Sequence, residues 1–188
     1  MDMETVDAIE LLKRDHREVE ELFTQICGDE GSAAQRRKLF EQIKAALTLH
    51  ASVEEKIFYP AVLEATRKKS DERQEIFEAY EEHANVKDTL KRIAALTPGD
   101  ETFIAKVQVL KELVLHHVKE EEGTMFPQVR SLLDEQELEE IGERMERAKS
   151  RASGAKASKN GRASKNGKAS GSRASGGTRR KTSRSSSR

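Results

Sequence analysis

The chain has 188 residues, of which 35% are hydrophobic and 4% aromatic, and its 34 basic residues balance its 34 acidic residues. This length suits one folded domain with additional sequence, and the low aromatic content without tryptophan disfavours a β-rich fold. The single cysteine, Cys27, excludes an intramolecular disulfide and thiolate zinc sites, so any metal must be held by histidine and carboxylate side chains.

Helical periodicity runs through most of the chain. Apolar residues recur at helical spacing in five segments that are separated by turn signals: residues 5–27, 33–69, 71–96, 103–129 and 131–149. Pro60 is expected to kink the second segment or to begin a new turn there. Four long helices with short connections predict an all-α fold, an antiparallel up-down four-helix bundle, and the fifth segment predicts a short C-terminal helix.

The C-terminal part differs in composition and charge. Residues 149–188 contain 13 basic residues and no acidic residue, which leaves about −13 on the part before them. From Ser150 onward the chain lacks Leu, Ile, Val, Phe, Tyr and Trp. Because such a segment buries too little apolar surface to offset the entropy of ordering, we predict a folded domain over 1–149 and a disordered basic tail over 150–188.

The N-terminus is acidic, and no run of about 18 apolar residues occurs. We therefore expect neither a signal peptide nor a membrane span, and a cytoplasmic location.

A pattern of histidine and glutamate occurs twice. Residues 50–60 and 117–127 both read His-x3-Glu-Glu-x3-aromatic-Pro. Each is preceded by another histidine 34 residues earlier, His16 or His83, so that an offset of 67 relates the two halves. The repeat indicates a duplicated helical hairpin, whose pseudo-two-fold axis brings the two sets of side chains to face each other.

This spacing favours metal binding over ordinary histidine–glutamate pairing. Residues i and i+4 lie on one helix face, so the imidazole and the carboxylate of each copy reach the same region. Two opposing carboxylates can bridge two metals, and four imidazoles leave positions open for a small ligand, a donor set that suits iron. The predicted ligands are His16, His50, Glu54, His83, His117 and Glu121.

Over about residues 7–130, this pattern resembles the hemerythrin HHE cation-binding family. The resemblance implies a helical bundle that holds two non-haem, carboxylate-bridged irons, with the same six residues as ligands. At one position the chain departs from the pattern of the family. Oxygen-carrying hemerythrins have a second histidine one turn after the first in the third helix, where this chain has Lys87. The departure disfavours simple reversible oxygen carriage.

Other side chains are candidates for secondary roles. His116 lies near the ligand face and is a candidate for an additional ligand, although the repeat places it outside the ligand frame. Tyr59 is either a core aromatic residue or a phenol that approaches the metals. Glu20, Glu55 and Glu122 either orient ligand imidazoles or are solvated, and for Glu55 and Glu122 we favour the solvated interpretation.

Three functional hypotheses follow from these features. In the first, the metal centre binds or senses oxygen, nitric oxide, peroxide or iron itself. In the second, the centre is an enzyme that resembles a catalase or peroxidase. In the third, the basic tail associates with nucleic acid through its phosphates, without reading base sequence. A solubilising tail, or one that folds back on the acidic domain, is the alternative to the third.

Overall fold

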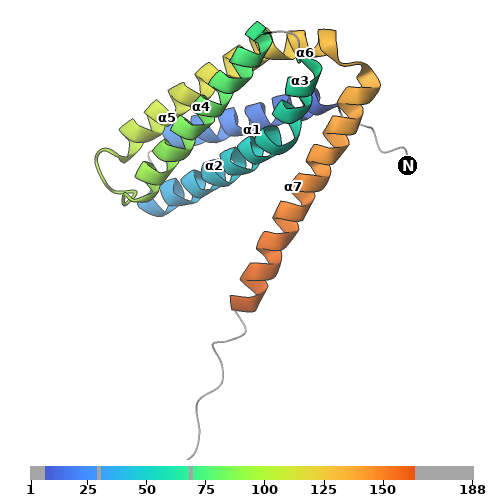
Figure 1. The fold of residues 1–188 in the computed structure, drawn as a ribbon. Helices are drawn as coiled ribbons and strands as arrows, with labels where there is room; N and C mark the ends of the chain where they lie inside the picture. The colour runs from blue at the N-terminus through green and yellow to red at the C-terminus, as the bar shows by residue number, and fades with distance from the viewer. Residues whose placement is uncertain (1–6, 29–30, 68–69, 164–188) are drawn as a thin grey trace, which may run out of the picture. The chain divides into compact units, whose positions relative to one another are not determined.

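The structure is a computed structural model that describes residues 7–28, 31–67 and 70–163 (Figure 1). Within these residues all regular structure is helical, as predicted. The chain divides into a compact unit of residues 1–153 and a second unit of residues 154–188. Residues 164–188, which make up most of the predicted basic tail, lie outside the described residues.

Seven α-helices and two π-helical turns make up the described structure. The α-helices are α1 (Ala8–Gly28), α2 (Ala33–Val53), α3 (Tyr59–Ala65), α4 (Ser70–Ala94), α5 (Phe103–Glu120), α6 (Phe126–Leu132) and α7 (Glu135–Ala163). The π-turns are η1 (Glu54–Phe58) and η2 (Glu121–Met125). Helix α1 packs against α2 and α5, and α4 packs against α5 and α2, which closes the predicted antiparallel four-helix bundle. No helix among the described residues is long and apolar enough to span a membrane.

Polar side chains define where individual helices begin. Ser32 and Gln35 form a capping box at the start of α2, in which each side chain bonds to the backbone of the other residue. Asp134 and Glu137 make the same reciprocal pair before α7, at 2.9 Å in both directions. These bonds satisfy N–H groups that would otherwise lack partners at the first turn.

The π-turns follow from the two prolines of the repeated pattern. Pro60 has no N–H, and its ring would collide with the carbonyl of residue 56 in an ordinary α-helix. The helix widens just before it, so that the N–H of Tyr59 donates to the carbonyl of Glu54, five residues earlier. The second copy repeats this geometry, with the N–H of Phe126 donating to the carbonyl of Glu121. Pro60 therefore produces the new turn that the sequence predicted.

The bundle interior consists of a polar layer between two apolar layers. One apolar layer includes Phe40, Ile43 and Phe103. The other includes Leu12, Phe58 and Leu138 of α7. On each long helix the buried histidine lies between residues of these two layers. Apolar packing on both sides therefore holds the polar residues away from water.

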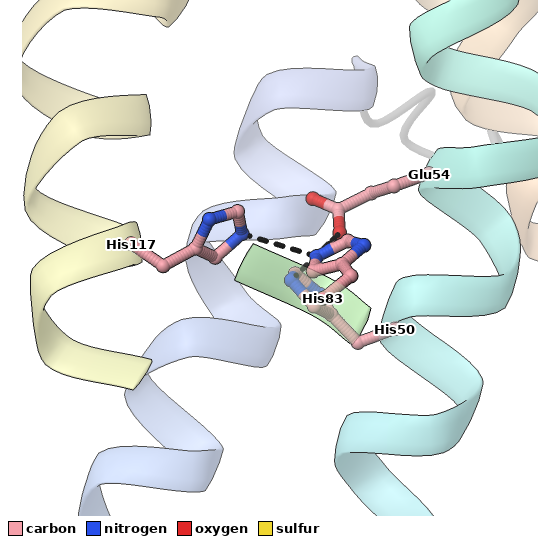
Figure 2. A group of neighbouring side chains, drawn as sticks. All are labelled: His50, Glu54, His83 and His117. Carbon is pink, nitrogen blue, oxygen red and sulfur yellow. Dashed lines mark hydrogen bonds and ion pairs between the residues drawn. The ribbon is translucent and has the colours of Figure 1, made fainter. Parts of the chain in front are cut away.

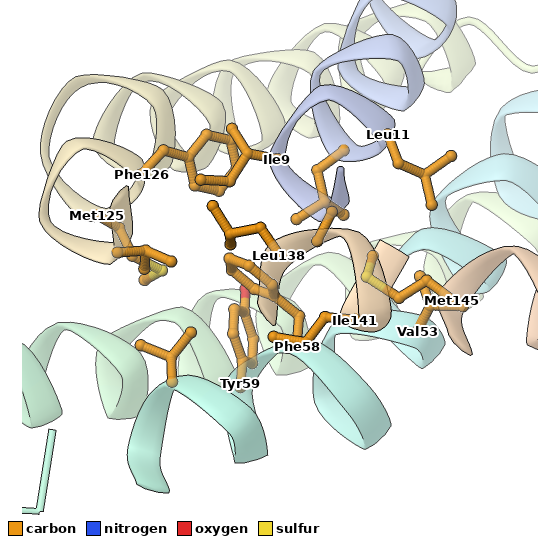
Figure 3. Close-up of a cluster of buried hydrophobic side chains, with 14 of the residues drawn as sticks. Ile9, Leu11, Val53, Phe58, Tyr59, Met125, Phe126, Leu138, Ile141 and Met145 are labelled. Carbon is orange, nitrogen blue, oxygen red and sulfur yellow. The ribbon is translucent and has the colours of Figure 1, made fainter. Parts of the chain in front are cut away.

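The C-terminal helix differs from the short helix that was predicted to end at Lys149. Leu138, Ile141 and Met145 of α7 join the same buried cluster as Leu11 and Phe58 (Figure 3). Helix α7 then continues to Ala163, beyond the predicted boundary at Ser150. The alanine, lysine and arginine residues that follow this boundary are good helix formers.

Candidate metal centre

The structure brings together all six residues that were predicted to be ligands. They are His16, His50, Glu54, His83, His117 and Glu121, and each is at most 5% exposed. The histidines come from the four long helices, and each glutamate is the first residue of a π-turn. Proteins seldom bury two carboxyl groups side by side unless other charges compensate them.

Glu54 lies beside two imidazoles in one half of this group (Figure 2). Its Oε2 is 3.0 Å from Nε2 of His50 and 3.3 Å from Nε2 of His83. The Nε2 atom of His83 is also only 3.1 Å from Nε2 of His117. Three imidazoles and one carboxylate thus point their potential ligand atoms at one small region.

Glu121 occupies the corresponding position in the other half. Its Oε2 is 3.3 Å from Nε2 of His16 and 3.4 Å from Nε2 of His117. Its Oε1 accepts a hydrogen bond of 2.8 Å from the hydroxyl of Tyr59. Tyr59 is therefore both a buried aromatic residue and a phenol that reaches the polar layer.

The glutamate that follows each ligand glutamate orients a histidine on another helix. Nδ1 of His16 lies 2.7 Å from Oε1 of Glu122, and Nδ1 of His83 lies 3.0 Å from Oε1 of Glu55. The solvated interpretation of Glu55 and Glu122 was therefore wrong. The widened π-turn lies within the bundle, so both residues of each Glu-Glu pair reach inward.

The acid that precedes each repeated histidine orients a third and a fourth imidazole. Nδ1 of His117 lies 2.7 Å from Oε2 of Glu82, and Nδ1 of His50 lies 3.4 Å from Oδ2 of Asp15. Neither acid was predicted from the sequence, although the offset of 67 relates Asp15 to Glu82 just as it relates the histidines.

These four contacts determine which nitrogen of each imidazole carries the proton. An ionised carboxylate only accepts hydrogen bonds, so the Nδ1 atom that faces it carries the proton. In the neutral imidazole the Nε2 atom then has its lone pair directed at the centre, which is the usual arrangement of a metal-ligating histidine.

The interior atoms fit a bound cation. Among the described side chains, both carboxylate oxygens of Glu54, Oε2 of Glu121 and Nε2 of His16 are buried without a hydrogen-bond partner. Two groups of potential ligand atoms each lie within 4.8 Å of one another: His50, Glu54, His83 and His117, and His16, His50, Glu54 and Glu121. Facing lone pairs and carboxylates repel one another, and positive charge between them removes this repulsion.

Burial and neighbouring charges separate the acidities within the centre. Burial raises the pKa of Glu54 well above its ordinary value, and the charge of Glu121 raises it further. Burial acts the same way on Glu121, but the imidazoles of His117 and His16 outweigh it and hold its pKa below the ordinary value. Burial lowers the pKa of His50 to about 4, so this imidazole is neutral near pH 7. Neutral imidazole is the form that binds metal.

Two lysines lie outside the ligand group and contact its acids. Lys87, at the position where the resemblance implied a histidine, donates to Oε1 of Glu55 rather than reaching the centre. Lys149 of α7 donates to Oδ2 of Asp15 at 2.6 Å. The third long helix therefore provides one imidazole, His83, to the centre.

Two other candidates do not join the buried group. His116 is 64% exposed, and its Nε2 is 3.2 Å from Oε1 of Glu120. His116 points away from the buried group, because a step of one residue along an α-helix turns the side chain by about 100° from His117. Glu20 is exposed, and the carboxylate beside His16 is that of Glu122.

A four-helix bundle with four inward-facing imidazoles and two buried carboxylates defines a cation-binding helical protein. The family model described as "Hemerythrin HHE cation binding domain" matches residues 7–129 of this chain. The chain belongs to this family, as the sequence resemblance implied.

Individual relatives agree with this assignment. A crystal structure of a hemerythrin HHE cation binding domain-containing protein from Mycobacterium kansasii, the Rv2633c homolog, matches with a TM-score of 0.66 and 28% identity, covering 78% of this chain and 90% of that one. The uncharacterized protein Rv2633c of Mycobacterium tuberculosis is 27% identical over 144 residues, 74% of this chain and 83% of that protein. A DNA nickase of Nostoc sp. is 29% identical over 151 residues, 80% of this chain, which spans only 41% of the Nostoc protein.

Proposed function

We propose that this chain is a non-haem di-iron protein whose centre binds or senses a small ligand such as oxygen, nitric oxide or peroxide. The observation that carries the proposal is that His50 and Glu54 belong to both groups of potential ligand atoms. One carboxylate shared between two neighbouring groups is the arrangement needed to bridge two ions. The mixture of imidazole and carboxylate donors suits iron.

The residues that would hold the irons are His16, His50, Glu54, His83, His117 and Glu121. When bound, two irons supply open coordination positions and a change of oxidation state. The protein holds the ligand side chains in position. The four acids Asp15, Glu55, Glu82 and Glu122 hold the imidazoles in position.

A small cavity beside the four histidines supports the proposal that the ligand is small. Its volume is about 20 Å³, enough for about one water-sized molecule. The remaining wall is mostly apolar and includes Val19, Leu47, Val86 and Val114. A cavity of this size and character favours a diatomic molecule or peroxide over an organic substrate.

Peroxide turnover is the alternative for the same centre. It is supported by the position of Lys87, which bonds to Glu55 and leaves His83 as the imidazole that the third long helix contributes. An iron with fewer nitrogen ligands has more open positions and greater reactivity.

One experiment tests binding and turnover together. The purified chain, loaded with ferrous iron under nitrogen, is expected to hold about two irons per chain and to change its near-ultraviolet absorption on exposure to oxygen. His50→Ala is expected to lose at least one iron, because His50 belongs to both ligand groups. Lack of stoichiometric iron binding by the wild-type chain would contradict the central proposal.

Peroxide consumption by the same preparation distinguishes the alternatives. Consumption well above that of free iron, and lost in His50→Ala, supports an enzyme. Iron-loaded protein that consumes peroxide no faster than free iron supports binding or sensing. Glu112→Ala is the control, because Glu112 is an exposed residue of α5 outside the buried group.

A second proposal concerns association with DNA through the C-terminal basic residues. The 13 basic residues of positions 149–188 support it, as does the similarity to a DNA nickase. We expect retention on DNA to fall about tenfold or more between about 50 and 200 mM salt, because phosphate contacts release counterions. A chain that ends at Ser153 is expected to lose this retention. Equal retention by the shortened and full-length chains would exclude the tail as the DNA-binding segment.

A further inference from the structure

The two duplicated halves of the bundle carry different side chains at equivalent positions near the candidate metal centre. In the first half, Leu11 and Val53 lie in the apolar cluster that includes Met145 of α7 (Figure 3). The offset of 67 relates these two residues to Glu78 and Glu120. Equivalent positions are therefore apolar and buried in one half and acidic in the other.

A cavity of about 220 Å³ lies at these acidic positions. Its wall includes four carboxylates from α4 and α5: Glu75, Glu78, Glu82 and Glu120. The same cavity is also lined by His117 and Glu121, two residues of the buried centre. It therefore connects an acidic surface with the candidate ligands.

A group of metal-ligand type shares two residues, Glu82 and Glu120, with the wall of this cavity, and its third residue, His116, lines an adjoining pocket together with them. Potential ligand atoms of Glu82, His116 and Glu120 lie within 4.8 Å of one another. One oxygen of Glu82 is 3.7 Å from Nε2 of His116, and the other is 2.7 Å from Nδ1 of His117. A single carboxylate thus joins the exposed group to the buried centre. In the other half the equivalent acid, Asp15, is neutralised by Lys149.

The wall of the cavity also contains buried carboxylate oxygens without a hydrogen-bond partner, one of them on Glu75, which is not a candidate ligand of the centre. Glu121 is 1% exposed, and its Oε2 has no hydrogen-bond partner among the described residues. Oε2 of Glu75 is also buried without such a partner. Unpartnered carboxylate oxygens at both places favour a cation in the cavity.

We propose that this acidic cavity is the route by which ferrous iron reaches the buried centre, with Glu82, His116 and Glu120 as a transient binding site on the way. The proposal rests on the proposed di-iron function. Carboxylates that line a concave surface concentrate cations and accelerate their capture. The exposed position of His116, which excludes it from the centre, suits a site that takes iron from solution and releases it inward.

The test measures how fast metal-free, full-length protein takes up ferrous iron under nitrogen. A colorimetric ferrous chelator, added at successive times, reports the iron that remains accessible. Glu78→Gln/Glu120→Gln and His116→Ala are expected to slow uptake, the double variant by about tenfold at low salt. Both are expected to reach the wild-type iron content. Added salt should slow the wild type more than the double variant.

The matched control is Glu18→Gln/Glu21→Gln, which removes the same charge from exposed positions of α1 that do not line the cavity. It is expected to load at the wild-type rate. Equal slowing in the control would overturn the proposal, since net charge alone would then explain the effect. Wild-type rates in both cavity variants would also overturn it, as would a lower final iron content. A wild-type chain that takes up no iron would instead contradict the di-iron function itself.

Discussion

Ferrous iron, added under nitrogen, is expected to raise the midpoint of thermal unfolding by about 10 °C. Binding at 1,000 times the dissociation constant stabilises a folded protein by about 4 kcal/mol, and each kcal/mol shifts the midpoint of a chain of this size by about 2–4 °C. The physical source is the relief of repulsion between Glu54 and Glu121, two buried carboxyl groups whose potential ligand atoms lie within 4.8 Å of each other. Differential scanning calorimetry measures the shift.

The variant Glu54→Gln/Glu121→Gln is expected to lose this shift. Two amides cannot replace the negative charge that the cations require, but they keep nearly the same volume. The metal-free variant is expected to unfold at or above the wild-type temperature, because it no longer buries two competing carboxyl groups. Glu18→Gln/Glu112→Gln changes two exposed residues and serves as the control. An iron-dependent rise that persists in the Glu54 and Glu121 variant would place the metal elsewhere.

Removal of α7 is expected to destabilise the bundle by about 6 kcal/mol. Leu138, Ile141 and Met145 are at most 5% exposed, and burial of each such side chain contributes about 1.5–3 kcal/mol. This sum is an upper range, since the denatured chain buries some apolar surface as well. It is nevertheless comparable with the whole stability of a typical domain, about 5–15 kcal/mol.

Urea unfolding of three chains measures this effect. A chain that ends at Asp134 lacks α7 and is expected to unfold at a much lower denaturant concentration than the full-length chain. A chain that ends at Ser153 keeps the three buried residues and the contact between Lys149 and Asp15, so it is expected to match the full-length chain. Equal midpoints for all three would show that α7 does not contribute to the core.

Local sequence patterns were sufficient to predict the helices and the six candidate ligands. Helical periodicity and the i, i+4 spacing of His50 with Glu54 are properties of one helix, independent of its neighbours. The offset of 67 extended this information across the bundle, because a duplicated hairpin brings equivalent residues such as His50 and His117 to face each other. The family match and the structural relative agree with the predicted helical bundle.

Contacts between helices were decided by the tertiary structure. The pairing of Glu122 with His16, 106 residues apart, depends on how η2 packs against α1. The contact of Lys149 with Asp15 depends on α7 packing against the bundle. Sequence spacing places a residue on a helix face, but the partner on another helix depends on packing between helices.

The sequence by itself therefore determined which residue types form the candidate centre and their order along the helices. Only the tertiary structure decided which acid orients each histidine, that Lys87 bonds to Glu55, and that His116 lies beside Glu82 and Glu120 outside the centre. The physical reason is the distance along the chain over which each effect acts. Periodicity acts within a few residues of one helix, whereas burial and charge pairing depend on elements that meet only when the bundle closes.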